Sequence, residues 1–252
     1  MSRAALEAWE LLLAFAGSFV AGYLGSVVGL VLGSLRLPVL LLVSGSAPAA
    51  AGTNIAVSAA AALSGAVAHV RAGRVDWRIV AWMTPPSVAG AFLGGFFAQA
   101  LPARVLLAGI AAVLAWSGLD LLLELRTPPR ARRPRLAAAF AGALIGLLGG
   151  AVGLILGTLR LPALLGGVGL SAHRAVGTNL VVGFFLGVAG FLAHALRLEV
   201  EWALLGVGLA GAIPGAWLGA RTSGRLSERA LRRAIGVALL AVAVALAAEA
   251  AL

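Results

Sequence analysis

The sequence contains no cysteine and no lysine, and only 11% of its 252 residues are charged. The missing cysteines exclude a disulfide framework, thiol chemistry and cysteine metal sites. Three histidines leave no spaced set of metal ligands, and there is neither a nucleophile elbow nor a phosphate loop. An intramembrane enzyme could use Arg36, Asp120 and His69, but no particular reaction follows from these three residues. We therefore expect no enzyme, no cofactor and no metal.

Most of the chain is apolar. Hydrophobic residues make up 62% of the chain, whose mean hydropathy is +1.05, whereas a soluble domain carries about 25% charged residues. The N-terminus continues into an apolar stretch without a clean cleavage site, which favours a first membrane helix over a removed signal peptide. Charge-free runs near the ~20 residues of a membrane span lie at 11–35, 79–103, 136–159, 175–196 and 202–220, with shorter ones at 105–119 and 234–248. The sequence predicts an all-α polytopic membrane protein.

A long segment occurs twice. Residues 25–38, GSVVGLVLGSLRLP, return as residues 149–162, GGAVGLILGTLRLP. Downstream pairs keep a spacing of 125 residues: Thr53-Asn54 with Thr178-Asn179, His69 with His194, Asp76-Trp77 with Glu201-Trp202. We divide the chain into membrane repeat 1 (1–125), a basic linker (126–135) and membrane repeat 2 (136–252). Duplicated apolar chains are typical of transporters, whose site lies where the copies meet.

Each repeat contains an interrupted apolar segment. The run from Leu37 to Val70 is too long for one span and too short for two spans with a turn. Its middle, SGSAPAAAGTN, is rich in helix-breaking residues, and LPALLGGVGLSAHRAVGTN interrupts the second copy at the matching place. We expect about four full helices per repeat plus one interrupted or half-length helix. Such segments are the best sequence indication of a transporter site.

Arginine placement indicates how the repeats are oriented, because basic residues collect in cytoplasmic loops. Four crossings per half would divide the arginines ten against nine, which is no bias. An odd number of crossings per half places fourteen arginines on one side of the membrane and three on the other, with Arg36 and Arg160 set aside as intramembrane. The fourteen are Arg71, Arg74, Arg78, Arg126, Arg130, Arg132, Arg133, Arg135, Arg174, Arg221, Arg225, Arg229, Arg232 and Arg233. We predict inverted repeats in the cell membrane with a cytoplasmic linker and both termini outside; a parallel eight-span bundle is the alternative.

The order of these motifs resembles one family of membrane proteins. A glycine-rich first helix ending near a proline, an Ala-x-Gly-Thr-Asn segment, an acid-Trp loop and a Gly-x-x-x-Gly helix all occur twice. This order resembles the sulfite exporter TauE/SafE family over nearly the whole chain. The resemblance implies an integral membrane protein that moves sulfite, sulfonates or related organosulfur anions. Leu35-Arg36-Leu37 and Leu159-Arg160-Leu161 depart from the longer glycine run that the family usually has before the proline.

Arg36 and Arg160 occupy equivalent places in predicted membrane segments. A guanidinium near the bilayer centre costs at least ~2.5–3.5 kcal/mol, so it normally faces a polar cavity, a partner or a pathway. Its planar fork of donors suits a sulfonate, sulfite or carboxylate. We predict contact with substrate. The alternative is an interfacial turn in which each arginine snorkels, or pairs with Asp120 or with backbone carbonyls.

Polar and glycine pairs supply further candidates. We expect Thr53, Asn54, Thr178 and Asn179 to begin helices, either as simple caps or as contacts to an anion at the positive helix ends. The recurring glycines favour close helix packing. The sharper alternative is that their exposed backbone lines a path, for which the candidates are Gly29, Gly33, Gly153 and Gly157.

His69 and His194 end charge-poor runs. Histidine carries protons near neutral pH, so both are candidates for proton coupling. The alternative is an interfacial histidine bonded to water or backbone. Asp76 and Glu201 precede tryptophans of a predicted aromatic belt and are expected to help start the following helices.

These observations predict a secondary transporter for a small anion that works by alternating access between the repeats. An anion channel and a structural or assembly protein of the membrane are the other hypotheses. The expected partners are a small anionic substrate and membrane lipids, and a homo-oligomer is compatible with the sequence. The basic linker is explained by topology and lipid headgroups, so we expect no nucleic-acid binding.

Overall fold

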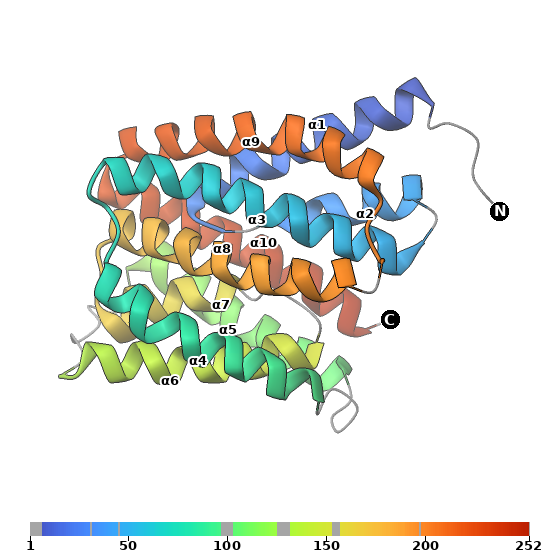
Figure 1. Ribbon diagram of the computed structural model, residues 1–252. Helices are drawn as coiled ribbons and strands as arrows, with labels where there is room; N and C mark the ends of the chain where they lie inside the picture. Colours follow the sequence, from blue (N-terminus) through green and yellow to red (C-terminus); the bar gives the residue numbers. More distant parts are fainter. Residues whose placement is uncertain are drawn as a thin grey trace.

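A computed structural model describes residues 7–30, 32–44, 46–96, 103–124, 132–152, 157–196 and 198–251. Within these ranges the regular elements are all helical (Figure 1). The first half holds α1 (Ala8–Val28), α2 (Gly33–Ser44), α3 (Ala47–Arg71), α4 (Trp77–Phe96) and α5 (Ala103–Leu123). The second half holds α6 (Pro134–Val152), α7 (Gly157–Pro162), the π-helical η1 (Ala163–Val168), α8 (Ala172–Leu196), α9 (Trp202–Arg225) and α10 (Glu228–Ala251).

Six of these helices are long and apolar enough to cross a membrane, namely α1, α3, α5, α8, α9 and α10. The prediction of an all-α polytopic membrane protein is therefore confirmed. The first expected span, 11–35, is wrong in its extent, because α1 ends at Val28. Gly29 adopts a left-handed φ of 73° there, and its N–H bonds back to the carbonyl of Gly25. A residue without Cβ takes this conformation at little cost, which stops the helix before the repeated arginine motif.

The predicted interruption is present in both halves. In the first half the short α2 is followed by the separate α3. In the second half α7 continues directly into η1, which ends where Gly169 takes a left-handed φ of 81°. The expectation that Thr53-Asn54 and Thr178-Asn179 begin helices is wrong, since α3 begins at Ala47 and α8 at Ala172. Pro48 lies in the first turn of α3, where its missing N–H costs no helical hydrogen bond.

Helices of one half pack on helices of the other (Figure 1). The largest contacts join α1 to α9, α6 to α4, α5 to α10 and α3 to α8. The start of α3 meets the end of α8, where Gly52 lies against Glu199 and His194. The start of α8 meets the end of α3, where Gly177 lies against Arg74 and His69. Thus α3 and α8 are antiparallel neighbours, and corresponding helices exchange corresponding contacts.

Glycines allow these helices to approach closely, as the packing interpretation predicts. A Cβ at Gly22 of α1 would lie 2.7 Å from the carbonyl oxygen of Ala212 in α9. One at Gly142 of α6 would lie 2.6 Å from the carbonyl oxygen of Met83 in α4. Real Cβ atoms do not come this close to backbone, so larger residues would force the pairs apart. The backbones themselves form the contact surface, as in small-xxx-small membrane interfaces.

The described arginines of the predicted cytoplasmic set lie on helix ends that gather at one end of the bundle. Figure 1 shows the ends of α3, α5 and α9 there, together with the starts of α4, α6, α8 and α10. The first turn of α1 and the last turn of α10 lie at the opposite end. We call the arginine-bearing end the linker end, because α5 and α6 flank the basic linker. Within that set, Arg126 and Arg130 lie outside the described residues.

Candidate functional site

Arg36 lies in the first turn of α2 with 1% of its surface exposed. Its partners come from α3. Nε donates to Oδ1 of Asn54 at 3.0 Å, and Nη2 donates to the same oxygen at 2.7 Å. Nη2 also donates to the Asn54 carbonyl at 2.9 Å and to Oγ of Ser58 at 2.7 Å. Asn54 and Ser58 are four residues apart and so share one face of their helix, which orients the guanidinium.

Arg160 lies in α7 with 2% of its surface exposed, at the position that corresponds to Arg36. Its Nε donates to Oδ1 of Asn179 at 2.9 Å. Asn179 is fully buried, and its Nδ2 donates to the carbonyl oxygens of Gly29 at 2.7 Å and Gly157 at 3.0 Å. One amide thus orients Arg160 and ties the second half to the end of α1.

The two arginines differ in how fully they are satisfied. Nη2 of Arg160 is buried and has no hydrogen-bond partner in the part of the chain that the structure describes. In the first half, Nη2 of Arg36 donates to the hydroxyl of Ser58. The position that corresponds to Ser58 in the second half is Gly183, which has no side chain to accept a hydrogen bond from Arg160. Ser58 does not belong to the motifs that the two copies share. Its position four residues after Asn54 on α3 is the signal that could have found it.

Neither Arg36 nor Arg160 forms an ion pair with an acid of the described residues. Within the described ranges the ion pairs use Asp76, Glu124, Glu199 and Glu228, and none includes Arg36 or Arg160. Both side chains are buried within the bundle, so neither snorkels to its surface, whereas the alternative of pairing with a backbone carbonyl holds for Arg36, which donates to that of Asn54. Pairing with Asp120 is absent, and Oδ1 of Asp120 is itself buried without a partner among the described residues. Two amides, one hydroxyl and one carbonyl therefore hold two buried cations whose charge stays uncompensated.

Thr53 and Thr178 are fully buried and serve helices of the opposite half. The hydroxyl of Thr53 accepts a hydrogen bond from the backbone N–H of Glu201 at 2.9 Å. That of Thr178 accepts one from the backbone N–H of Asp76 at 3.0 Å. Each donor residue directly precedes a helix, α9 or α4. These hydroxyls fix the position of helix starts across the two halves.

The predicted backbone candidates fall close to the arginines. The carbonyls of Gly29 and Gly157 both accept from Asn179. A Cβ at Gly33 would lie 2.7 Å from Oγ of Ser58 and 3.0 Å from Nδ2 of Asn54. Gly153 lies outside the described residues. Three of the four candidates therefore border the buried arginines and their partners.

The two candidate proton carriers have different surroundings. His69 is fully buried, and neither ring nitrogen has a hydrogen-bond partner in the described part of the chain. His194 is half-buried, and its Nδ1 lies 2.7 Å from Oε2 of Glu199. The residue that corresponds to Glu199 in the first half is Arg74. Asp76 caps α4 as expected, because its Oδ1 accepts from the backbone N–H groups of Arg78 and Ile79.

Two cavities lie next to the arginine segments. The cavity beside Arg36 measures about 10 Å³, room for about one water. Leu180, which follows Asn179, also lines it, so the surroundings of the two arginines meet there. A larger cavity of about 880 Å³ lies between α5, η1 and α10, and its lining includes Pro162 and Leu165 just after Arg160.

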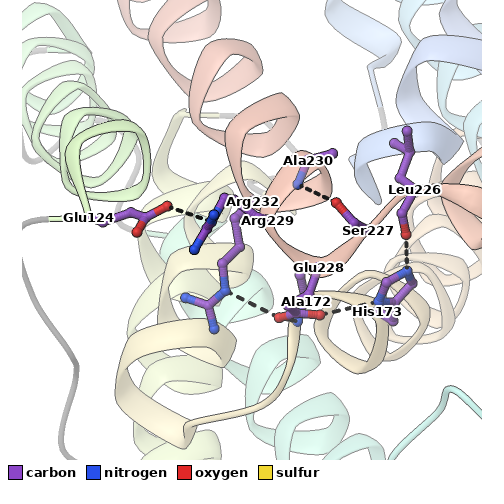
Figure 2. A network of polar contacts seen from close by, with 9 residues as sticks. All are labelled: Glu124, Ala172, His173, Leu226, Ser227, Glu228, Arg229, Ala230 and Arg232. Carbon is purple, nitrogen blue, oxygen red and sulfur yellow. Dashed lines mark hydrogen bonds and ion pairs between the residues drawn. The ribbon is translucent and has the colours of Figure 1, made fainter.

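Charged groups surround the larger cavity at the linker end (Figure 2). Glu228 accepts hydrogen bonds from the backbone N–H of Ala172 at 2.6 Å and from Nε of Arg232 at 3.2 Å. Its other oxygen lies 3.2 Å from Nδ1 of His173. Arg229 lies 3.4 Å from Glu124 across α10 and α5. The network joins the starts of α8 and α10 beside the cavity.

The fold and the buried arginines define the class of this protein as a polytopic membrane protein with a charged centre inside its helical bundle. In that class, intramembrane ionisable groups mark pathways for solutes or ions. The described residues include no cluster of three or more His, Asp or Glu side chains that could hold a metal ion.

Comparison with known proteins identifies the family. Residues 14–246 match the family described as "Sulfite exporter TauE/SafE". The chain belongs to this family of membrane transporters. It is 28% identical to a "Probable membrane transporter protein" of Xylella fastidiosa (strain 9a5c), over 79% of this chain and 80% of the relative. It is 26% identical to "Probable membrane transporter protein YdhB" of Bacillus subtilis, over 81% and 83%. No solved structure matches the chain.

Proposed function

We propose that the protein is a secondary transporter for a small anion, with sulfite and organic sulfonates as the leading substrates. The observation that carries the proposal is the pair of buried arginines, 1% and 2% exposed, that lack a carboxylate partner among the described residues. A buried charge without a counter-charge is costly. An anion that enters from water would recover part of this cost, and the free Nη2 of Arg160 is available to bind it.

We further propose that the two halves are inverted copies that carry the arginines to a shared region. The reciprocal contacts of α1 with α9 and α6 with α4, and the antiparallel contact of α3 with α8, support this arrangement. In this orientation the linker end is cytoplasmic and the membrane is the cell membrane, as the positive-inside rule favours.

Access to the arginines would alternate between the two ends of the bundle. The cavity of about 880 Å³ reaches Pro162 and Leu165 from the linker end, so we assign it as the route toward Arg160. The cavity at Arg36, about 10 Å³, is too small for a sulfonate and would have to open. Movement of α2 and of α7 with η1, which carry the arginines on short elements, would supply that opening. His69 and His194 stay candidates for proton coupling.

The test is anion flux in proteoliposomes that contain the purified full chain. Sulfite and a small sulfonate are offered to the wild type, to Arg36→Gln, to Arg160→Gln and to the double variant. Each single change removes a charge-assisted contact worth about 1.5–3 kcal/mol, so we expect flux to fall about 10–100-fold. Arg233→Gln, at an exposed arginine of α10, is the matched control and should transport like the wild type.

Thermal unfolding in detergent shows whether each variant is folded. If the glutamine variants do not fold, Arg→Lys variants at both positions take their place, because lysine retains the charge and removes the planar fork of donors. Flux that stays at wild-type level in the folded double variant would remove the arginines from the site. Flux that follows the electrochemical gradient without saturation would assign a channel instead. Absence of flux and of stabilisation by any anion in the wild type would favour a structural role in the membrane.

A further inference from the structure

A second basic pocket lies away from the buried arginines, between the end of α3 and the end of α9. It has a volume of about 350 Å³ and is lined by Arg71, Arg74, Arg221 and Arg225, together with Trp217. We call it the arginine pocket. Arg71, Arg221 and Arg225 are exposed and Arg74 is half-buried, so the guanidinium groups are open to a ligand.

The charge of the arginine pocket is uncompensated among the residues that the structure describes. The ion pairs of the described residues involve other arginines, Arg174, Arg229 and Arg232, and other acids. No carboxylate lies within salt-bridge distance of any of the four pocket arginines in the described ranges. Four like charges that share one concavity repel one another, which an anion would relieve.

Neighbouring residues shape this pocket. The guanidinium of Arg221 stacks on the ring of Trp217, with Cζ 3.5 Å from the ring centroid. The Arg74 guanidinium reaches across to α9 and lies directly on Gly224, where an added Cβ would come within 2.9 Å of Nη2. Stacking restrains Arg221, and the missing side chain of Gly224 makes room for Arg74.

The location of the pocket indicates the source of the anion. Both membrane-length segments that build it, Pro48–Arg71 and Trp202–Arg225, end in the pocket itself. It therefore lies at the depth where a span leaves hydrocarbon and meets the headgroups, the depth that tryptophan prefers. Guanidinium groups bind phosphate in a bidentate manner.

We propose that the arginine pocket binds a phosphate group, with the headgroup phosphate of an anionic phospholipid as its natural source and soluble phosphate as the other source. This site is separate from Arg36 and Arg160, so it stands or falls independently of the transported anion. Its role would be to hold the ends of α3 and α9 together at the membrane surface.

The experiment measures binding to the full chain in a non-ionic detergent by native mass spectrometry and thermal shift. The probes are dioctanoyl phosphatidylglycerol, dioctanoyl phosphatidylcholine and inorganic phosphate, all at constant ionic strength. The pocket variant is Arg74→Gln/Arg225→Gln. The charge-matched control is Arg133→Gln/Arg135→Gln, at two exposed residues that also lie at the linker end.

We expect saturable binding of phosphatidylglycerol in preference to phosphatidylcholine. Each arginine that contacts the phosphate directly contributes at least about a tenfold change in affinity, so the pocket variant should bind roughly 100-fold more weakly. The control should change less than about twofold. Competition by inorganic phosphate would assign free phosphate as a second ligand, and its absence would assign the lipid alone; both outcomes support a phosphate site.

An equal loss of affinity for phosphatidylglycerol in the pocket variant and in the control would show that binding is diffuse electrostatic attraction, which would overturn the proposal. Failure of every probe to bind saturably would overturn it as well. If the double variant does not fold, Arg74→Lys/Arg225→Lys keeps the charge and removes the bidentate geometry. Trp217→Leu keeps all four arginines and removes the stacking on Arg221. Unchanged binding in both would contradict a shaped site.

Discussion

The same substitution at two equivalent asparagines should destabilise the protein at Asn179 and leave its stability nearly unchanged at Asn54. Asn54→Asp places a carboxylate where Oδ1 already accepts from Arg36 at 3.0 and 2.7 Å. The amide nitrogen of Asn54 donates to no described residue, so the change removes no such hydrogen bond. In Asn179, by contrast, Nδ2 donates to the carbonyls of Gly29 and Gly157, and Asn179→Asp would lose both bonds.

The expected sizes follow from these contacts. Hydrogen bonds between membrane helices contribute about 0.6–1.7 kcal/mol each, so Asn179→Asp should cost about 1–3 kcal/mol. A carboxylate oxygen placed 2.7 Å from the Gly29 carbonyl adds repulsion. At about 2–4 °C per kcal/mol for a chain of this size, the melting midpoint should fall by roughly 2–12 °C. Asn54→Asp forms an ion pair with Arg36, and its midpoint should stay within a few degrees of the wild type.

Function should respond differently from stability. Asn54→Asp neutralises Arg36 in place, so sulfite or sulfonate flux in proteoliposomes should fall about 10–100-fold although the protein stays folded. Thermal unfolding in detergent and flux are measured on the same preparations. Equal destabilisation of the two aspartate variants would refute the hydrogen-bond reasoning. Wild-type flux in Asn54→Asp would refute the role of an uncompensated Arg36 charge.

Three further changes test the packing and the polar contacts by thermal unfolding in detergent. Thr178→Val leaves the backbone N–H before α4 without its buried partner and should cost about 1–3 kcal/mol, whereas Thr178→Ser should restore stability. Gly142→Ala should cost about 1–3 kcal/mol because its Cβ meets backbone of α4, while Gly109→Ala, with nothing within 4 Å, should be neutral or slightly stabilising; equal effects would contradict the close contact. Glu124→Gln should change stability by less than about 1 kcal/mol, since Glu124 and Arg229 are 55% and 72% exposed, and a larger loss would show that this pair is more than a surface contact.

Local sequence features are enough to predict the helical membrane fold and to single out Arg36 and Arg160. Both arginines stand in apolar segments next to a proline, and a charge in that setting must face the protein interior. The extent of the first helix could not be read from charge-free runs, because Gly29 ends α1 inside an apolar stretch. A run without charged residues indicates a membrane segment, but the backbone conformation at a residue such as Gly29 determines where the helix ends.

Contacts between distant residues explain most of what the sequence did not reveal at the site. Thr53 was expected to cap its own helix, but its partner is the backbone of Glu201, 148 residues away. Ser58 gave no signal in the comparison of the two copies, because the second copy has Gly183 at that position. Repetition highlights residues that both copies share, so it overlooks those that make the two arginine sites unequal.

The partnership of α1 with α9 has a consequence for how the chain is made. The glycine-lined face of α1 is complete when Val28 has been synthesised, but its partner helix begins only at Trp202. At roughly 5–20 residues per second, ribosomes need about 10–30 s to reach that helix. During this interval α1 must wait in lipid or beside the insertion machinery without its final neighbour. Biogenesis of this protein is therefore a late assembly of early and late segments, completed only when the second copy emerges.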